Sequence, residues 1–298
     1  MCDTILSFSN MKFGFSLLLM AAIMVEDHSA QKLRLENWMG DLPDPIKDMP
    51  LIFLAIPGSH DSMTYGITRS STVAPDAEPI LNRLYPLFRG TILRWTITQA
   101  SDTWQQLLIG IRYFDLRLAT KAGDDKFYFT HGLYGDEISM ALGQIRKFVD
   151  SHPGEVIVVY RNETVNTTGE FWQPQMMPSP WPRQDSITGL LNFLTNIRRN
   201  PSTGFVHQAV LTPTPTFILL RWISSLRQKC AVPVINEVLP KLAEFSPGPP
   251  APHLKAGARS TVNVVIADFV DMDDAIFPRT IIDLNMKLLR HTELVHYG

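Results

Sequence analysis

The sequence has few cysteines, no long block of like charge and no internal repeat. Its 298 residues include only two cysteines, Cys2 and Cys230, which excludes a disulfide framework and a cysteine-based zinc site. Lys and Arg total 27 against 29 for Asp and Glu, without the basic face or tail that is typical of nucleic-acid-binding proteins. We therefore expect no nucleic-acid partner, and we expect any bound phosphate to contact a few individually placed cations.

Long apolar runs are also missing, although 45% of the residues are apolar and can supply a sizeable core. The one notable run, residues 13–25, follows Lys12 and precedes polar residues and Ala30. This pattern is typical of a signal peptide and is too short to span a bilayer as an ordinary helix. We expect residues 1–32 to be a signal peptide, the alternative being a disordered leader, and we expect no transmembrane span.

Two N-glycosylation sequons, which begin at Asn162 and Asn166, agree with passage through the secretory pathway. We therefore expect the protein to be secreted or bound peripherally at an extracellular membrane surface. A cytoplasmic protein with a disordered leader is the alternative.

Strand and helix patterns alternate from Leu51 onward. Apolar runs predict strands at 51–56, 111–117, 127–131, 156–160, 205–211 and 262–269. Helical spacing of apolar residues predicts helices at 138–149, 190–197, 215–229, 234–245 and 281–289. This alternation is typical of an α/β fold with a parallel sheet.

Six strands are two short of a closed eight-stranded barrel. The shortfall lies between Asn162 and Asp185, in a stretch rich in proline and tryptophan that cannot hold both a helix and a strand. A missing strand–helix unit would leave two strand edges without partners. We expect residues 33–298 to form one barrel domain with this unit absent.

Polar side chains gather at the ends of three predicted strands. His60, Asp115, Arg117 and His131 all fall there, where parallel α/β folds build their active sites. Taken singly, each has a plain alternative: a histidine at a strand end is usually a hydrogen-bonded loop residue. Asp115 and Arg117 share one face of a strand and suit a structural ion pair as well as a phosphate site. Together, they are hard to explain as packing.

These residue types match the needs of phosphodiester cleavage. The reaction requires a base for the nucleophile, an acid for the leaving oxygen, and positive charge on the phosphoryl oxygens. Two histidines that titrate near neutral pH can act as base and acid, and arginine offers a permanently charged fork to phosphate. The pattern therefore indicates phosphodiester chemistry.

The same segments resemble the phosphatidylinositol-specific phospholipase C X-domain-containing proteins, and also the bacterial phosphatidylinositol phospholipases C. The resemblance is carried by residues 57–64 (PGSHDSMT), 98–99 (TQ), 113–117 (YFDLR), 130–132 (THG), 262–270 (VNVVIADFV) and 282–285 (IDLN). It runs from about Asn37 to Leu289. It implies an α/β fold of the TIM-like (β/α) barrel type, here incomplete, with a βα unit missing after Asn162.

The resemblance also implies roles for individual residues. His60 would be the general base, His131 the general acid, and Arg117 the group that stabilises the charge on phosphorus. Asp268 would orient His60, while Asp61 and Asp115 would fix the charge and position of the other groups. The expected products are diacylglycerol and a cyclic inositol phosphate.

Substrate contacts are expected from Arg161 and Asn162, and the expected partner is a phosphoinositide lipid at a membrane surface. We expect no metal and no other cofactor. Calcium-dependent relatives place carboxylates where this chain has Arg117, and again near Arg161, and arginines at such positions would repel a cation that needs several oxygen ligands.

Two other functions stay open at this stage. One is a catalytically weak or inactive phosphoinositide- or inositol-phosphate-binding protein, although such a protein has no need of both histidines. The other is a metal-dependent glycerophosphodiesterase, which would want a cluster of carboxylates at the strand ends.

Several remaining aromatic and histidine residues have no catalytic assignment. Phe171, Trp172 and Trp181 would either insert into a lipid interface or pack over the shortened barrel, and packing is favoured. The remaining histidines without a role are predicted to be ordinary surface residues: His207, His253, His291 and His296.

Overall fold

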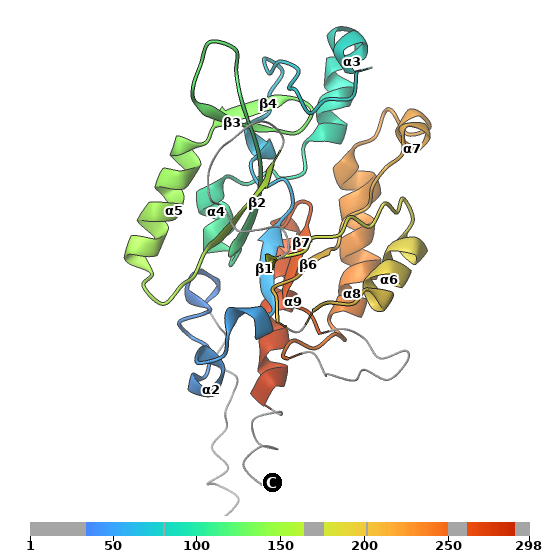
Figure 1. Cartoon of the computed structure of the whole chain (residues 1–298). Helices are drawn as coiled ribbons and strands as arrows, with labels where there is room; N and C mark the ends of the chain where they lie inside the picture. Colours follow the sequence, from blue (N-terminus) through green and yellow to red (C-terminus); the bar gives the residue numbers. More distant parts are fainter. Residues whose placement is uncertain (1–33, 80, 164–175, 201, 250–260, 290–298) are drawn as a thin grey trace, which may run out of the picture. The chain divides into compact units, whose positions relative to one another are not determined.

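The computed structural model describes residues 34–79, 81–163, 176–200, 202–249 and 261–289 (Figure 1). The predicted signal peptide lies outside these ranges. The strands are β1 (Ile56–Ser59), β2 (Tyr113–Thr120), β3 (Phe127–Thr130), β4 (Tyr134–Glu137), β5 (Val158–Glu163), β6 (Val206–Gln208) and β7 (Val264–Ala267). The α-helices are α2 (Asp44–Lys47), α3 (Leu81–Thr96), α4 (Thr103–Leu108), α5 (Ser139–Ser151), α6 (Ile187–Asn196), α7 (Pro215–Leu219), α8 (Leu239–Leu242) and α9 (Met272–Asp283).

Shorter helical turns complete the described part. The 3₁₀ turns are Leu35–Asn37, Leu51–Phe53, Thr64–Gly66 and Leu284–Leu288, and the π-helical turns are Arg227–Ala231 and Val234–Val238. Within the described residues, no helix is both long and apolar enough to cross a bilayer.

Five strands form a parallel set in the spatial order β5, β2, β1, β7, β6. The central strand β1 is buried along its whole length and pairs with β2 on one side and with β7 on the other. Gly58 lies between Tyr113 and Ile266, and a Cβ at this position would come within 2.9 Å of both side chains. Glycine is therefore required for the three strands to meet at this point.

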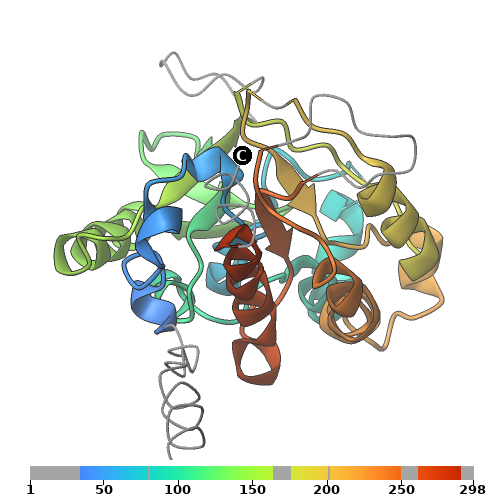
Figure 2. The same ribbon diagram turned by 90° about the horizontal axis from the view of Figure 1, so that it is seen from below.

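Helices surround the strands, as seen along the sheet in Figure 2. Helix α5 buries Ala141 and Phe148 against the core, and α6 buries Leu190 and Leu194. Both follow the helical spacing of apolar residues in the sequence. Their packing fixes the strands from outside and leaves the strand ends available for polar residues.

Helix α4 was not predicted from the sequence, although its start carries a recognisable signal. The Asp102 carboxylate accepts a hydrogen bond from the Gln105 backbone N–H at 2.8 Å, and the two residues form a capping box. From this helix, the Gln106 amide donates to the Ser62 carbonyl at 2.9 Å. The helix therefore supports the loop that follows β1.

Some predicted elements differ from the observed ones. The apolar run predicted as a strand at 51–56 begins as a 3₁₀ turn, and β1 starts only at Ile56, where pairing with β7 begins. Helices α3 and α4 and strand β4 were not predicted. The predicted parallel sheet holds for the five strands above, whereas β3 pairs antiparallel with β2 and β4 pairs antiparallel with β3.

The stretch after β5 has the largest consequence for the fold. Backbone N–H groups of Gly204, Val206 and Thr212 donate to the carbonyls of Met176, Pro178 and Gln184, at 3.1, 2.9 and 2.7 Å. Residues 176–184 therefore run along the outer edge of β6 in constant register. Prolines suit this position because the segment only accepts these hydrogen bonds and proline has no N–H to donate.

The prediction of two unpartnered edges was therefore wrong for β6, which has the residue 176–184 segment as its neighbour. Strand β5 is different: among the described residues its only strand partner is β2. Within the described residues the sheet curls without closing. The fold is an α/β TIM-like barrel, and in the described part of the chain no strand pairing joins β5 to β6.

Candidate active site

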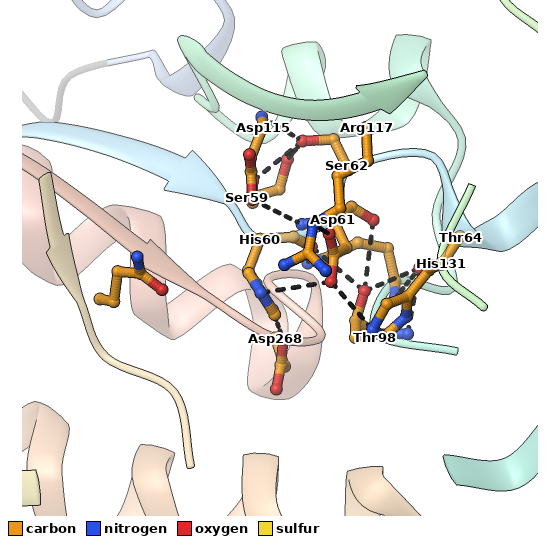
Figure 3. Close-up of polar contacts among 12 residues, drawn as sticks. Ser59, His60, Asp61, Ser62, Thr64, Thr98, Asp115, Arg117, His131 and Asp268 are labelled. Atoms are coloured by element: carbon orange, nitrogen blue, oxygen red, sulfur yellow. Dashed lines mark hydrogen bonds and ion pairs between the residues drawn. The ribbon is translucent and has the colours of Figure 1, made fainter. Parts of the chain in front are cut away.

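His60 follows β1 directly, and Asp268 follows β7 (Figure 3). Because Ser59 pairs with Ala267, the next residue of each strand falls at the same level. His60 Nδ1 lies 2.7 Å from Asp268 Oδ1, and the His60 side chain is buried. A carboxylate only accepts, so Nδ1 carries the hydrogen and Nε2 is directed toward the rest of the site.

Asp61 is the fully buried centre of the cluster. Its Oδ1 lies 2.8 Å from Arg117 Nε, and its Oδ2 lies 3.2 Å from His60 Nε2 and 3.3 Å from His131 Nε2. These distances are those of ion pairs, but the angles are not those of hydrogen bonds. Three basic side chains therefore face the Asp61 carboxylate without forming hydrogen bonds to it.

The Asp61 backbone has a φ of 43°, in the left-handed region. Aspartate tolerates this conformation better than most residues, although it still carries some strain. The turn is held by Thr98, whose hydroxyl lies within donating distance of the carbonyls of His60 and Asp61, at 3.1 and 3.2 Å. Strained backbone held by surrounding contacts is frequent at functional sites.

Asp115 and Arg117 lie two residues apart on β2 and face the cluster together. The Asp61 backbone N–H is 3.3 Å from Asp115 Oδ2, and the Asp115 backbone N–H donates to the Ser62 hydroxyl at 2.8 Å. Both residues therefore belong to the same network as His60. An isolated ion pair between Asp115 and Arg117 does not describe this arrangement. Arg117 instead pairs with Asp61, which comes shortly after the neighbouring strand β1.

His131 reaches the cluster by a route that differs from the prediction. Instead of ending a parallel strand, it follows β3, which runs antiparallel to residues 118–120 of β2. Strand β2 continues past Arg117, and the antiparallel strand β3 runs back so that its end lies beside Leu118 of β2. His131 Nδ1 lies 2.8 Å from the Thr96 carbonyl at the end of α3, so Nδ1 carries the hydrogen and Nε2 faces Asp61.

The electrostatics push the ionisable groups of the site in different directions. Burial alone would lower the pKa of His60, but the carboxylates of Asp61 and Asp268 outweigh it and raise this pKa to about 9. Burial would raise the pKa of Asp61, but His131, His60 and Arg117 outweigh it and lower this pKa. Burial and the Asp61 charge raise the pKa of Asp115. Two neighbouring carboxyl groups with divergent pKa values are typical of acid–base sites.

Several supporting residues were not assigned a role from the sequence. The Gln99 amide donates to the carbonyls of His60 and Ala267, both at 2.9 Å, and so ties the ends of β1 and β7 together. The hydroxyls of Ser59 and Ser62 lie 2.7 Å apart beneath the cluster. Thr98 and Gln99 form one of the segments that resemble the phospholipase C sequences. This resemblance was the signal in the sequence that could have assigned them a role.

Trp181 packs at the site. Its ring centroid lies 5.3 Å from that of His60, and the Arg117 guanidinium carbon lies 5.7 Å from the Trp181 ring. The Trp181 ring is half-buried against the site, which agrees with the packing interpretation. Phe171 and Trp172 lie outside the described residues.

The two expected substrate contacts, Arg161 and Asn162, are placed only by their backbone. They lie on β5 opposite Leu116 and Arg117, and their side chains lie outside the described part of the chain. Their role stays a prediction.

The prediction that His207 is a surface residue was wrong. It lies on β6, fully buried, with its ring centroid 4.9 Å from that of Phe205. Burial and the nearby Arg199 charge lower its pKa to about 3, so it is neutral at physiological pH. His253, His291 and His296 lie outside the described residues.

One group in the described residues could offer three ligand atoms to a metal. These atoms of His60, Asp61 and Asp115 lie within 4.8 Å of one another. Calcium takes six to eight oxygen ligands, whereas this group offers one nitrogen and two carboxylates with Arg117 already paired to Asp61. The donor set therefore does not fit calcium.

Comparisons with known proteins identify relatives of the chain and of its fold. No protein-family profile matches the chain. PI-PLC X domain-containing protein 2 of Mus musculus is 30% identical over 308 residues, which covers 84% of this chain and 87% of the relative. PI-PLC X domain-containing protein 3 of Danio rerio is 29% identical over 327 residues, covering 89% and 98%.

Among solved structures, substituted forms of phosphatidylinositol-specific phospholipase C from Staphylococcus aureus give TM-scores of 0.55 and 0.56 at 16% identity. They cover 85% of this chain and 98% and 97% of the bacterial chains. The fold is therefore that of the phospholipase C barrels. The chain belongs to the PI-PLC X domain-containing proteins, as the mouse relative shows.

Proposed function

We propose that this protein is a phosphoric diester hydrolase of the phospholipase C type. It cleaves phosphatidylinositol-like lipids to diacylglycerol and a cyclic inositol phosphate without a metal. The observation that carries the proposal is the convergence of His60 Nε2, His131 Nε2 and Arg117 Nε on Asp61, each within 3.3 Å of a carboxylate oxygen. A base, an acid and a fixed cation are what phosphodiester cleavage requires.

In the first step, His60 Nε2 takes the proton of the inositol 2-hydroxyl while Asp268 holds the ring in place through Nδ1. The freed oxygen attacks phosphorus, and the bond from phosphorus to the diacylglycerol oxygen breaks. His131, protonated on Nε2, gives its proton to that oxygen. Arg117 stabilises the negative charge that develops on the phosphoryl oxygens.

Hydrolysis of the cyclic product uses the same groups with exchanged roles. His131, now neutral, takes a proton from water, and the water oxygen attacks phosphorus. The bond to the inositol 2-oxygen breaks, and His60, now protonated, returns a proton to it. Both tautomers are fixed by contacts on Nδ1, which keeps the two Nε2 atoms on the substrate side.

A lipid substrate, rather than a soluble diester, is supported by an exposed apolar surface beside the site. We call it the docking face. Its side chains come from α3 and from the segment that starts in α7: Leu84, Leu87, Phe88, Leu219, Leu220, Trp222 and Ile223. Leu87 and Ile223 are each 76% exposed, which is unusual for large apolar side chains gathered on one surface.

The two parts of the docking face are joined. The Arg94 guanidinium donates to the carbonyls of Trp222 and Ser224 at 3.0 Å, and the Trp95 and Phe217 rings lie 6.1 Å apart. The C-terminal end of α3 also supplies the Thr96 carbonyl that holds His131. In Figure 1, α3 and α7 lie at the same end of the sheet as the β3–β4 hairpin.

The charges around the docking face are of one sign. Residues 81–96 and 215–229 contain no Asp or Glu, and their charged residues are Arg83, Arg89, Arg94, Arg221, Arg227 and Lys229. The whole chain has a formal net charge of −2, so this local excess of cations is specific to the face. Apolar side chains flanked by Lys and Arg favour the surface of an anionic membrane.

A second candidate function is supported by the missing strand pairing between β5 and β6 in the described part of the chain. An inactive phosphoinositide-binding protein would keep the pocket without turnover. The orientation of both histidines favours the enzyme, because ligand binding alone does not require two Nε2 atoms fixed toward one carboxylate.

The direct test uses the protein from Leu33 onward with phosphatidylinositol vesicles and excess chelator. The wild type is expected to release diacylglycerol, and His60→Ala and His131→Ala are expected to lose release at unchanged thermal stability. Arg146→Ala, on the exposed face of α5, is the matched control and is expected to stay active. A folded wild type without turnover, with or without calcium, would leave the binding protein as the function.

A further inference from the structure

The turn that follows His131, the proposed acid, is held by a segment between β1 and α3 to which the sequence assigned no role. Residues 72–74 run antiparallel to residues 132–134. The two stretches are joined by a β-bridge between Val73 and Leu133 and by backbone hydrogen bonds of 2.9 and 3.0 Å. The turn after His131 is therefore supported from outside the strand that leads into it.

Asp76 makes the one side-chain hydrogen bond between this segment and the turn among the described residues. Its Oδ2 accepts the backbone N–H of Gly132 at 3.2 Å. This N–H belongs to the planar peptide unit that starts at the His131 carbonyl, so the hydrogen bond fixes the backbone orientation next to His131. Gly132 has a φ of 67°, in the left-handed region that glycine adopts freely. The turn therefore needs such contacts to keep one conformation.

The His131 ring is sensitive to the position of its backbone. Nδ1 lies 2.8 Å from the Thr96 carbonyl, and Nε2 lies 3.3 Å from Asp61 Oδ2 (Figure 3). A general acid must lie within about 2.6 to 3.2 Å of the oxygen that it protonates. A small movement of the peptide after His131 would carry Nε2 out of this range.

The Asp76 carboxylate also acts electrostatically on the site. Burial would lower the pKa of Arg117, but nearby carboxylates outweigh it and raise this pKa, with Asp61 the largest contributor and Asp76 among the others. The Asp76 Oδ1 atom is buried and makes no hydrogen bond within the described residues. An unpaired buried oxygen costs stability, which a side chain with a purely structural role would avoid. Both observations agree with a carboxylate that serves the site.

We propose that Asp76 is a positioning residue for His131. This rests on the proposed function, which makes His131 the acid. The Asp76 carboxylate holds the peptide between His131 and Gly132, and this peptide holds the ring where Nε2 can give its proton to the leaving oxygen. Asp76 does not contact the reacting atoms. It assists protonation of the leaving oxygen and not attack by the inositol 2-hydroxyl, for which His60 is the base.

Two soluble diesters with different leaving groups test this role: inositol 1-(butyl phosphate) and inositol 1-(4-nitrophenyl phosphate). Butanol, like diacylglycerol, needs a proton to leave, whereas 4-nitrophenolate leaves without one. Asp76→Ala is expected to lower kcat for the butyl diester about 100-fold at unchanged KM, the cost of a misplaced catalytic group. For the nitrophenyl diester the expected loss is less than about threefold, because the acid is not needed.

Two further variants separate the hydrogen bond from other effects. Asp76→Asn keeps an oxygen that can accept from Gly132, and it is expected to stay within about threefold of the wild type on both diesters. Asp124→Ala is the matched control, because Asp124 accepts the Lys126 backbone N–H at 3.0 Å at the opposite end of β3 from His131. It is expected to leave both rates unchanged. Thermal unfolding is expected to show every variant folded, since Asp76 is half-buried in a loop.

Equal losses on the two diesters in Asp76→Ala, or an unchanged rate on the butyl diester, would overturn the proposal. A loss in Asp76→Asn as large as in Asp76→Ala would also overturn it. If the wild type cleaves both diesters and one of these results is found, the positioning role fails and the hydrolase function stands.

NMR of the histidine rings gives a readout that does not depend on turnover. The His131 Nδ1–H signal is expected to be sharp in the wild type and in Asp76→Asn, and to broaden in Asp76→Ala, while the His60 signal stays unchanged. If the wild type cleaves neither diester, the hydrolase function fails and these signals decide the positioning role. A His131 signal that is equally sharp in all three proteins would overturn it.

Discussion

His60 Nδ1 lies 2.7 Å from Asp268 Oδ1, although the two residues are 208 positions apart in the chain. The register of β1 and β7, with Ser59 opposite Ala267, brings them together. Gln99 fixes the same two strand ends by donating to the carbonyls of His60 and Ala267. The orientation of the proposed base is therefore set by the sheet itself, and several consequences can be measured.

Asp268→Asn is expected to move the pH dependence of cleavage. His60 must be neutral to act as the base, so kcat/KM rises with pH through its pKa, which the carboxylates of Asp61 and Asp268 raise to about 9. Loss of the Asp268 charge leaves the opposing effect of burial and moves the rising limb to lower pH. Asp150→Asn, on the exposed side of α5, is the control, and an unshifted limb in Asp268→Asn would contradict this account.

His60 is also expected to make stability depend on pH. Its pKa in the folded protein, about 9, lies above the ordinary value of 6.5. The protonated ring therefore stabilises the fold fully below pH 6.5, and this contribution is lost as pH rises from 6.5 through 9. Urea unfolding of the wild type and His60→Gln should show a difference in unfolding free energy that shrinks over this range. A difference independent of pH would show that the ring is not charged in the fold.

Arg117→Lys is expected to lower kcat about 100-fold, the cost of losing one donor to a developing oxyanion. Lysine keeps the positive charge but not the rigid fork of the guanidinium, so the loss reports geometry rather than net charge. Single-turnover cleavage measures it, with thermal unfolding as the check on folding. A kcat near that of the wild type in Arg117→Lys would show that the Arg117 guanidinium fork is not what stabilises the charge on the phosphoryl oxygens.

Leu219→Ser and Ile223→Ser on the docking face are each expected to weaken vesicle binding about tenfold, because each removes an apolar side chain from the interface. Hydrolysis of soluble cyclic inositol phosphate should be unchanged, since neither residue is at the cluster. Met140→Ser on α5 is the matched control, because Met140 is 73% exposed on another helix. Equal losses on the soluble substrate would assign these side chains to folding instead of docking.

Much of the site could be predicted because each polar residue adjoins an apolar run. His60 and Asp268 both follow buried strands, and parallel pairing of such strands brings their ends together. His131 was identified for a different reason than the observed one. A short apolar run indicates a strand but not its direction, so the antiparallel return of β3 could not be foreseen from residues 127–131.

Other features leave little trace in local sequence. His207 lies in a short strand that is buried on both faces, so alternation does not separate inward from outward positions. The residue 176–184 segment has no strand pattern, yet its carbonyls accept hydrogen bonds from Gly204 and Val206 along β6. The segment accepts these hydrogen bonds whatever its own side chains are, so its position depends on the donors of the partner strand and not on its own sequence pattern.

The most direct test of the central claim is a ³¹P NMR time course of phosphatidylinositol cleavage in excess chelator. Attack by the inositol 2-hydroxyl, with His60 as base, predicts that a cyclic phosphodiester appears first and converts slowly to the monoester. Neither species should form in His60→Ala or His131→Ala. Direct appearance of inositol 1-phosphate without the cyclic species, or turnover that stops when chelator is added, would contradict the two-histidine, metal-free mechanism.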